Sequence, residues 1–259
     1  MVEDAYRRHT DPRHAVPGAF TERSSIRSGD LYPKAFTLEN FQRVFADQMP
    51  YLGTSLVIAL SCVLVTLLIA LPASYAIAIL RLGGAKTVNF LLVVAQMIPA
   101  VVMALGFYQI FNEIGLLDTI PGLILADSTV AVPFAVMLLT SFMSGMPVSL
   151  IEAAKIDGAS NWRIFTRIVI PLSRNSIVTT SLFAFLWAWS DFMFASTLDS
   201  GGGLLRPITM GIYDYIGAQN QEWGPLMATA VVASIPTALL LIVAQKYVAA
   251  GVTAGAIKD

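Results

Sequence analysis

Long apolar stretches alternate with short polar segments along the chain, and five of the stretches are long enough to cross a lipid bilayer as helices. A membrane-spanning helix needs about 20 apolar residues, because roughly 30 Å of hydrocarbon is crossed at about 1.5 Å per residue. Lys and Arg occur only at the edges of these stretches. They are residues 52–80, 88–111, 120–143, 177–198 and 225–248. The pattern predicts an all-α bundle in a polytopic membrane protein.

The composition of the chain supports this prediction. Of its 259 residues 56% are hydrophobic and 13% charged, whereas soluble domains average about 25% charged residues. So few charges cannot cover a surface that faces water, so much of the chain must face lipid or protein. The single cysteine, Cys62, excludes an internal disulfide, and we predict no metal site because His9 and His14, both in the polar N-terminal segment, are the only histidines.

The charged residues of the short loops predict which side of the membrane each loop faces. Basic residues mark the cytoplasmic side, and they gather after the first and third stretches and at the end of the chain. These residues are Arg81, Lys86, Lys155, Arg163, Arg167, Arg174, Lys246 and Lys258. The loops between them are acidic, with Arg206 as their only base. We therefore expect a multi-pass protein of the cell (plasma or inner) membrane with a cytoplasmic C-terminus, and read the charges as signs of topology rather than of nucleic-acid binding.

This topology places the first fifty residues outside the cell although they hold seven basic residues. These are Arg7, Arg8, Arg13, Arg23, Arg27, Lys34 and Arg43. No apolar run in this segment could act as a signal peptide. We expect either that a preceding span is missing from the chain, or that the first span inserts with its N-terminus outside.

Prolines lie inside four of the five stretches, at Pro72, Pro99, Pro133 and Pro236. Each removes a backbone hydrogen bond and favours a kink, as in the broken helices of a moving transport core. Membrane helices also tolerate proline without any such role, so the prolines by themselves leave both interpretations open.

Asp191 lies near the outer end of the fourth stretch, close to Trp187 and Trp189. An ionisable residue at membrane depth is a functional candidate, and a carboxylate beside aromatic faces suits a polyhydroxylated solute. The three residues are therefore candidates for lining a solute pathway. The alternative is that Asp191 already reaches the external interface, with both tryptophans in the aromatic belt.

The segment between the third and fourth stretches predicts two short surface helices. Pro147 suits a first helical turn, and Gly158 suits a left-handed residue that ends the helix. Ser160 is a plausible N-cap for a second helix, which we expect to stop at Pro171. One interpretation is an amphipathic helix that lies on the lipid headgroups.

The residues of this segment also carry a family resemblance. Glu152-Ala153-Ala154 is followed after three residues by Gly158, after nine more by Ile168, and then by Ile170-Pro171. This spacing resembles the EAA signature of ABC importer permeases, with Ile170 in place of the usual Leu. Asp157 and Ala159 match its continuation, whereas Ser149 stands where an acidic residue is frequent.

Other segments are similar to the carbohydrate-uptake branch of these permeases, in its MalG-like subunits. Residues 189–192 resemble a recurring WNDF segment in which Ser190 replaces Asn, and the tail with Gly251, Thr253, Gly255 and Lys258 resembles the family's tail. The family has six spans. The resemblance therefore implies that the polar tail of residues 1–30 stands in place of the first span, before a permease domain over residues 31–259 with a cytoplasmic coupling loop at 144–175.

The resemblance implies a transport subunit rather than an enzyme. Such a chain forms half of the pathway for a sugar, together with a second permease subunit, two ATPase subunits and an external solute-binding protein, in contact with membrane lipid. The coupling residues would be Glu152, Ala153, Ala154, Asp157, Gly158, Ala159 and Pro171, and the tail would be a second ATPase contact. ATP and Mg would bind the ATPase subunit, because this chain contains no G-x4-G-K-[ST] phosphate loop.

Three other interpretations remain open. The chain could be a permease for another solute, such as glycerol phosphate or an amino acid. It could also be an inactive truncated permease. A membrane enzyme is a third class, but the chain contains neither H-E-x-x-H nor G-x-S-x-G.

Overall fold

The structure is a computed structural model, and it describes residues 38–81, 83–199, 206–216 and 222–256. Three of its helices are each long and apolar enough to cross a membrane. They are α2 (Glu39–Ala78), α5 (Ile120–Ser144) and α12 (Trp223–Ala256). Two bent pairs bring the number of possible spans to five. The described residues contain no strand, so the prediction of an all-α bundle is confirmed.

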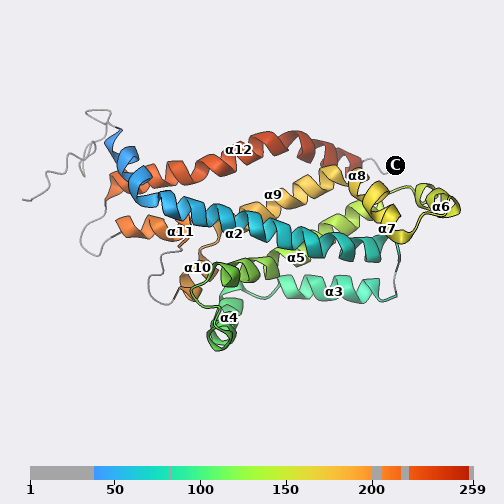
Figure 1. The fold of residues 1–259 in the computed structure, drawn as a ribbon, viewed down its shortest axis with the longest axis horizontal. Coiled ribbons are helices and arrows are strands. Elements are labelled where there is room, and N and C mark those ends of the chain that lie inside the picture. The colour runs from blue at the N-terminus through green and yellow to red at the C-terminus, as the bar shows by residue number, and fades with distance from the viewer. Residues whose placement is uncertain (1–37, 82, 200–205, 217–221, 257–259) are drawn as a thin grey trace, which may run out of the picture.

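The long helices run side by side along the length of the molecule (Figure 1). Helix α2 packs most extensively against α5, and also against α9 (Arg174–Ser190) and α12. The short helices α6 (Val148–Ile156), α7 (Asn161–Ile164) and α8 (Ile170–Leu172) gather at one end of the bundle, where α12 also ends (Figure 1). We call this end the loop end. Helix α11 (Ile208–Gly211) and the start of α12 lie at the opposite end.

The second predicted span is broken rather than straight. Helix α3 (Ala85–Gln96) and helix α4 (Ala100–Ile114) meet at an angle of 91°. Pro99 is the N-cap of α4, where its missing N–H costs no helical hydrogen bond. The kink that this proline favoured is thus confirmed, whereas Pro72, Pro133 and Pro236 lie inside continuous helices.

The fourth predicted span is shorter than residues 177–198, so its predicted end is corrected. Helix α9 ends at Ser190, and α10 (Met193–Leu198) begins after a two-residue break. The cause is Asp191, whose two carboxylate oxygens accept hydrogen bonds from the N–H groups of Phe194 at 3.2 Å and Ala195 at 3.0 Å. A side chain that satisfies the first N–H groups of a helix starts a new helix, so the chain turns here.

The first predicted span begins at Glu39 rather than at residue 52, because a polar extension of α2 precedes the apolar stretch. Arg43 on this extension pairs with Glu222 at 2.6 Å, just before α12. Burial raises the pKa of the Tyr215 phenol, which donates a hydrogen bond to Asp47 Oδ2 at 3.3 Å. These contacts hold the extension against Glu222, just before α12, and against Tyr215, a few residues after α11.

Small side chains fill the centre of the bundle. The buried residues where α2, α5 and α9 meet include Ala59, Cys62, Ala131, Ala184 and Ala188. Residues without bulk let helix backbones approach closely, which is how helices associate within lipid. The predicted tail of residues 1–30 and the residues up to 37 lie outside the described part of the chain.

Candidate functional site

Helix α6 carries the first half of the EAA-like segment at the loop end of the bundle. It begins after Pro147 and presents Glu152 and Ala153 on an exposed face. Ile151 points the other way and is 6% exposed, within a cluster of apolar residues from α2, α5 and the loop itself. The helix is thus held by one face and open on the other.

Gly158 ends α6 in the left-handed conformation, with φ +75°. The Ala159 N–H donates to the Ala154 carbonyl at 2.9 Å and the Gly158 N–H to the Lys155 carbonyl at 3.0 Å, a Schellman motif. The predicted end of the helix is therefore confirmed. A Cβ atom at Gly158 would meet nothing within 4 Å, so within this chain glycine is required by conformation rather than by space. Asp157, the residue before it, is exposed.

The second predicted helix starts where expected, because the Ser160 Oγ accepts a hydrogen bond from the Arg163 N–H at 3.3 Å. It continues as a π-helix over Phe165–Val169 and ends as α8 at Leu172, one residue beyond the predicted stop at Pro171. Pro171 cannot donate to the carbonyl four residues earlier and its ring crowds that position. The wide π turn just before it relieves this crowding.

The loop is fastened to the bundle by Tyr75, near the end of α2. The Tyr75 hydroxyl donates to the Asn161 carbonyl at 3.2 Å across 86 positions of sequence, and its ring lies 5.0 Å from that of Phe165. The preceding Ser74 donates to the Val136 carbonyl of α5 at 3.1 Å. Two neighbouring residues of α2 therefore join the loop and α5.

Large apolar side chains are exposed on the outer surface of the loop. Ile156 is 86% and Trp162 71% exposed, and Val148 and Leu150 are also exposed. Glu152 and Lys155 add charge to α6, the helix that also carries Val148, Leu150 and Ile156. An exposed apolar surface edged by charged residues is typical of a protein contact. We call the surface formed by these six residues the loop surface.

The three candidate pathway residues have different environments. Trp187 is 44% exposed, whereas Trp189 is 5% exposed and donates from Nε1 to the Ala233 carbonyl of α12 at 3.1 Å. Asp191 is partly buried and caps α10, and Thr209 donates to its backbone carbonyl at 2.7 Å. Trp187 thus presents its ring outward, Trp189 packs inside the chain, and pathway lining stays a prediction for all three.

The predicted tail contact falls largely on the end of α12. This helix continues to Ala256, beyond the predicted span, and so includes Gly251, Thr253 and Gly255. Its end lies at the loop end of the bundle (Figure 1). Lys258 lies outside the described residues.

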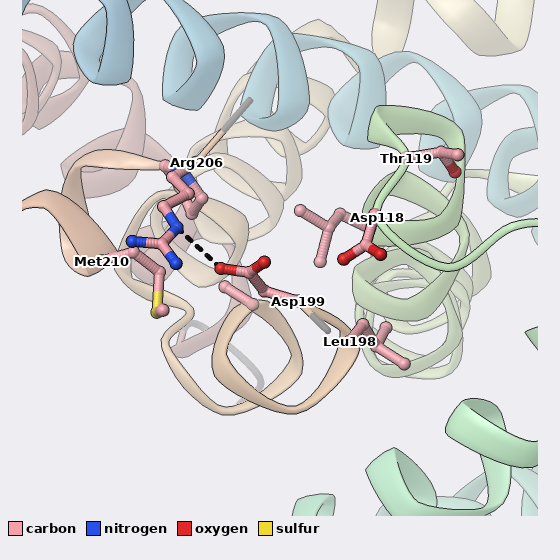
Figure 2. A pocket seen from close by; sticks show the side chains of 9 residues that line it. Asp118, Thr119, Leu198, Asp199, Arg206 and Met210 are labelled. Atoms are coloured by element: carbon pink, nitrogen blue, oxygen red, sulfur yellow. Dashed lines mark hydrogen bonds and ion pairs between the residues drawn. The ribbon is translucent and has the colours of Figure 1, made fainter. Parts of the chain in front are cut away.

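An ion pair that the sequence did not predict lines a small pocket between α5, α10 and α11 (Figure 2). Arg206 Nε lies 2.7 Å from Asp199 Oδ2, and Asp118 is on the opposite side of Asp199. The pocket holds about 30 Å³, room for a few waters at most. The pair joins Asp199, which follows α10, to Arg206, which precedes α11. Among the described residues no group of three His, Cys, Asp or Glu side chains is placed to bind a metal ion.

A bundle of apolar helices, some of them broken, with an exposed loop at one end is typical of the membrane subunit of a transporter. The sequence profile that matches residues 70–254 is that of the binding-protein-dependent transport system inner membrane component. The chain belongs to this family, and it is an ABC importer permease rather than an enzyme. The family resemblance noted in the sequence is thereby confirmed.

Individual relatives agree with this assignment. The chain is 31% identical over 245 residues to the trehalose/maltose transport system permease protein MalG of Thermococcus litoralis, covering 93% of this chain and 88% of that protein. It is 29% identical over 238 residues to the trehalose transport system permease protein SugB of Mycobacterium tuberculosis, covering 91% and 87%.

A solved structure shows the same fold. It is a bacterial ABC transporter involved in the import of the acidic polysaccharide alginate, with a TM-score of 0.72 at 20% identity. The match covers 83% of this chain and 81% of that one.

Proposed function

We propose that this chain is a sugar permease subunit that forms half of a translocation pathway. A second permease subunit forms the other half, two ATPase subunits dock on the loop ends, and an external binding protein delivers the sugar. The loop surface carries this proposal. It combines Glu152 and the exposed side chain of Ile156 on α6, whose other face is anchored by Ile151, with the exposed side chain of Trp162 on the neighbouring helix α7.

The anchored loop suits the transmission of force. An ATPase subunit that moves α6 also moves Ile151, and with it the apolar cluster that joins the loop to α2 and α5. Tyr75 and Ser74 add directed hydrogen bonds to this connection. Because the cluster is closely packed, closure of the ATPase dimer rotates these helices as a unit and alternates access to the pathway.

The orientation follows from the same assignment. ATPase subunits use cytoplasmic ATP, so the loop at residues 144–175 faces the cytoplasm, as its basic residues favour. The end of α12 lies at the loop end of the bundle, which supports a cytoplasmic C-terminus. The turns of α12 that hold Gly251, Thr253 and Gly255 form the second ATPase contact in this proposal, together with Lys258.

The substrate class is a neutral sugar. Relatives along nearly the whole chain are named for trehalose and maltose transport. The exposed Trp187 ring supports this choice because sugars stack on aromatic faces, and Asp191 follows just beyond the end of the same helix. Trp189 acts behind them, as a support between α9 and α12.

A cross-linking experiment tests the docking. Cys62 is buried and is the chain's single cysteine, so a Cys62→Ala background allows one new thiol at a time. A photoreactive maleimide on Ile156→Cys should attach to an ATPase subunit in native membranes. The matched control is Tyr213→Cys, which is 51% exposed just after α11, the helix at the opposite end of the bundle, and should attach to none. Absence of the ATPase subunit from the Ile156→Cys products would overturn the proposal.

The substrate is tested by deleting the gene and measuring the uptake of labelled solutes. Loss of trehalose or maltose uptake, with restoration by the intact gene, is the expected result. Loss of glycerol phosphate or amino acid uptake, with all sugar uptake unchanged, would show that the permease serves another solute class.

A further inference from the structure

The break between α3 and α4 leaves a hollow of about 280 Å³ in the surface of the bundle. Residues 95–100 of the break line one side of it, with Met103 from α4. Thr129 and Val130 from α5 and Trp187 from α9 line the remainder. Three helices and the broken segment therefore meet at this hollow.

The hollow lies about midway between the start of α3 and the start of α5. Gln96 ends a helix of 12 residues that starts at Ala85 at the loop end, which places it about 18 Å into the bundle at about 1.5 Å per residue. Helix α5 starts from the other side, and Thr129 lies about 15 Å along it from its N-cap, Thr119, at the same rise per residue. The two depths add up to about 33 Å, close to the roughly 30 Å of hydrocarbon.

The broken backbone leaves polar groups in the hollow. The N–H groups of Met97 and Ile98 bond to the carbonyls of Val94 and Ala95, and those of Val102 and Met103 share the Pro99 carbonyl. Among the described residues, no backbone donor reaches the carbonyls of residues 96–98 and no backbone acceptor reaches the N–H groups of residues 100 and 101. Non-helical backbone at membrane depth is tolerated where it is buried in protein or lines a polar cavity, so these groups need polar partners.

Side chains around the hollow supply further acceptors and one large aromatic face. The Gln96 Nε2 donates to the Leu92 carbonyl at 3.4 Å and lies 3.0 Å from Met137 Sδ, which leaves its amide oxygen as an acceptor. The Thr129 hydroxyl donates to the Ala126 carbonyl and can also accept. Trp187 adds an apolar ring that is 44% exposed.

None of the lining residues is ionisable. An uncharged site with backbone donors and acceptors does not balance a carboxylate, an ammonium group or a phosphate, whose burial costs far more than that of hydroxyls. The volume lies just below the roughly 300–1,000 Å³ of pockets for drug-sized ligands, so it admits one ring and not a chain. The chemistry thus fits a small, neutral, hydroxyl-rich ligand with an apolar face.

We propose that this hollow is a mid-membrane subsite for one ring of a neutral sugar. The ring lies on Trp187, and its hydroxyls bond to Gln96, Thr129 and the open backbone groups beside Pro99. This inference rests on the proposed function, because it takes the solute to be a sugar. It assigns the contact to the broken second span, which the sequence did not mark as a binding element.

A protection experiment tests the site in the complex purified from native membranes. In the Cys62→Ala background, Thr129→Cys should react with a charged, water-soluble methanethiosulfonate, and maltose or trehalose should slow the reaction. Glycerol 3-phosphate and leucine should not slow it. Leu105→Cys, on the exposed face of α4 and outside the hollow, is the control and should show no sugar-dependent change.

A thiol at residue 129 that stays unreactive would show that lipid or protein fills the hollow, and a reactive thiol that no sugar protects would show that sugar does not enter. Either outcome overturns the subsite. Binding-protein-stimulated ATP hydrolysis by the same preparation distinguishes the two proposals. With hydrolysis intact the importer stands and the subsite alone fails, whereas a preparation without any ATPase subunit removes both.

The aromatic contact has its own test. Trp187→Ala should raise the KM for sugar uptake by about tenfold, and Trp187→Phe should restore most of the affinity. Phe183→Ala is the matched control, since Phe183 is a similarly exposed aromatic residue on α9 that does not line the hollow. An unchanged KM in Trp187→Ala, or an equal rise in Phe183→Ala, would contradict the proposal.

Discussion

Substitution of Gly158 separates two reasons for a glycine in the coupling loop. The residue has φ +75°, and an added Cβ atom would meet nothing within 4 Å in this chain. The cost of Gly158→Ala therefore comes from the left-handed backbone alone, about 1–2 kcal/mol. Asn adopts this conformation more readily than Ala, so Gly158→Asn should cost less although its side chain is larger.

The expected readout is the affinity of the ATPase subunit for the permease pair in lipid nanodiscs. If the strained conformation must form before docking, 1–2 kcal/mol lowers the affinity about 5-fold to 30-fold in Gly158→Ala, and less in Gly158→Asn. Gly145→Ala is the control in the same loop. Its φ of −82° suits any residue and its Cβ would lie 3.4 Å from the Phe142 carbonyl, so the affinity should hardly change.

The order of the ATPase affinities of the two Gly158 variants distinguishes the two reasons for a glycine. A weaker affinity for Asn than for Ala would show that the ATPase subunit approaches the glycine so closely that side-chain size governs. Wild-type affinity in both variants, together with normal uptake, would refute a coupling role for this turn.

Substitutions at three further residues test how the loop and the fourth span are held. Tyr75→Phe keeps the ring and removes the 3.2 Å hydrogen bond to Asn161, so ATP hydrolysed per sugar transported should rise in proteoliposomes, and an unchanged ratio would contradict the role of Tyr75. Asp191→Ala removes the cap of α10, at a cost of about 0.5–2 kcal/mol, and should lower the unfolding temperature and uptake. Asp191→Asn keeps one acceptor oxygen for the cap and should restore most of both, and lost uptake in a stable Asn variant would indicate that the carboxylate contacts the solute. Trp189→Phe loses the bond to Ala233 and should lower the unfolding temperature by the equivalent of about 1 kcal/mol with an unchanged KM, whereas a raised KM at normal stability would place Trp189 in the pathway.

The sequence predicted the number and place of the apolar stretches but not which of them would break. Length and hydropathy suffice for α2, α5 and α12, because any apolar stretch of that length must satisfy its backbone as a helix in lipid. Proline alone does not decide the outcome. Pro99 begins a new helix, whereas Pro72 and Pro133 lie within continuous ones. The difference depends on packing, which the chain pattern does not encode.

The loop was predictable nearly to the residue because its structure is local. The cap by Ser160 and the left-handed turn at Gly158 each depend on neighbours within a few positions. The tie through Tyr75 was not predictable, since Tyr75 lies in an apolar stretch and its partner is 86 residues away. The hollow was missed for the same reason, because it forms only where the broken span meets α5 and α9.

The apolar cluster around Ile151 and Tyr75 has a consequence for the mechanics of the subunit. It joins the loop, α2 and α5 into one rigid unit, and a rigid unit does not bend within itself. Bending is then expected where the helices outside this cluster are interrupted, at Pro99 and at Asp191, and at the 76° bend between α8 and α9. The interruptions at Pro99 and Asp191 lie beside residues that border the hollow or the predicted pathway. These two interruptions would thus let the site change shape while the connection from the loop to α2 and α5 stays rigid.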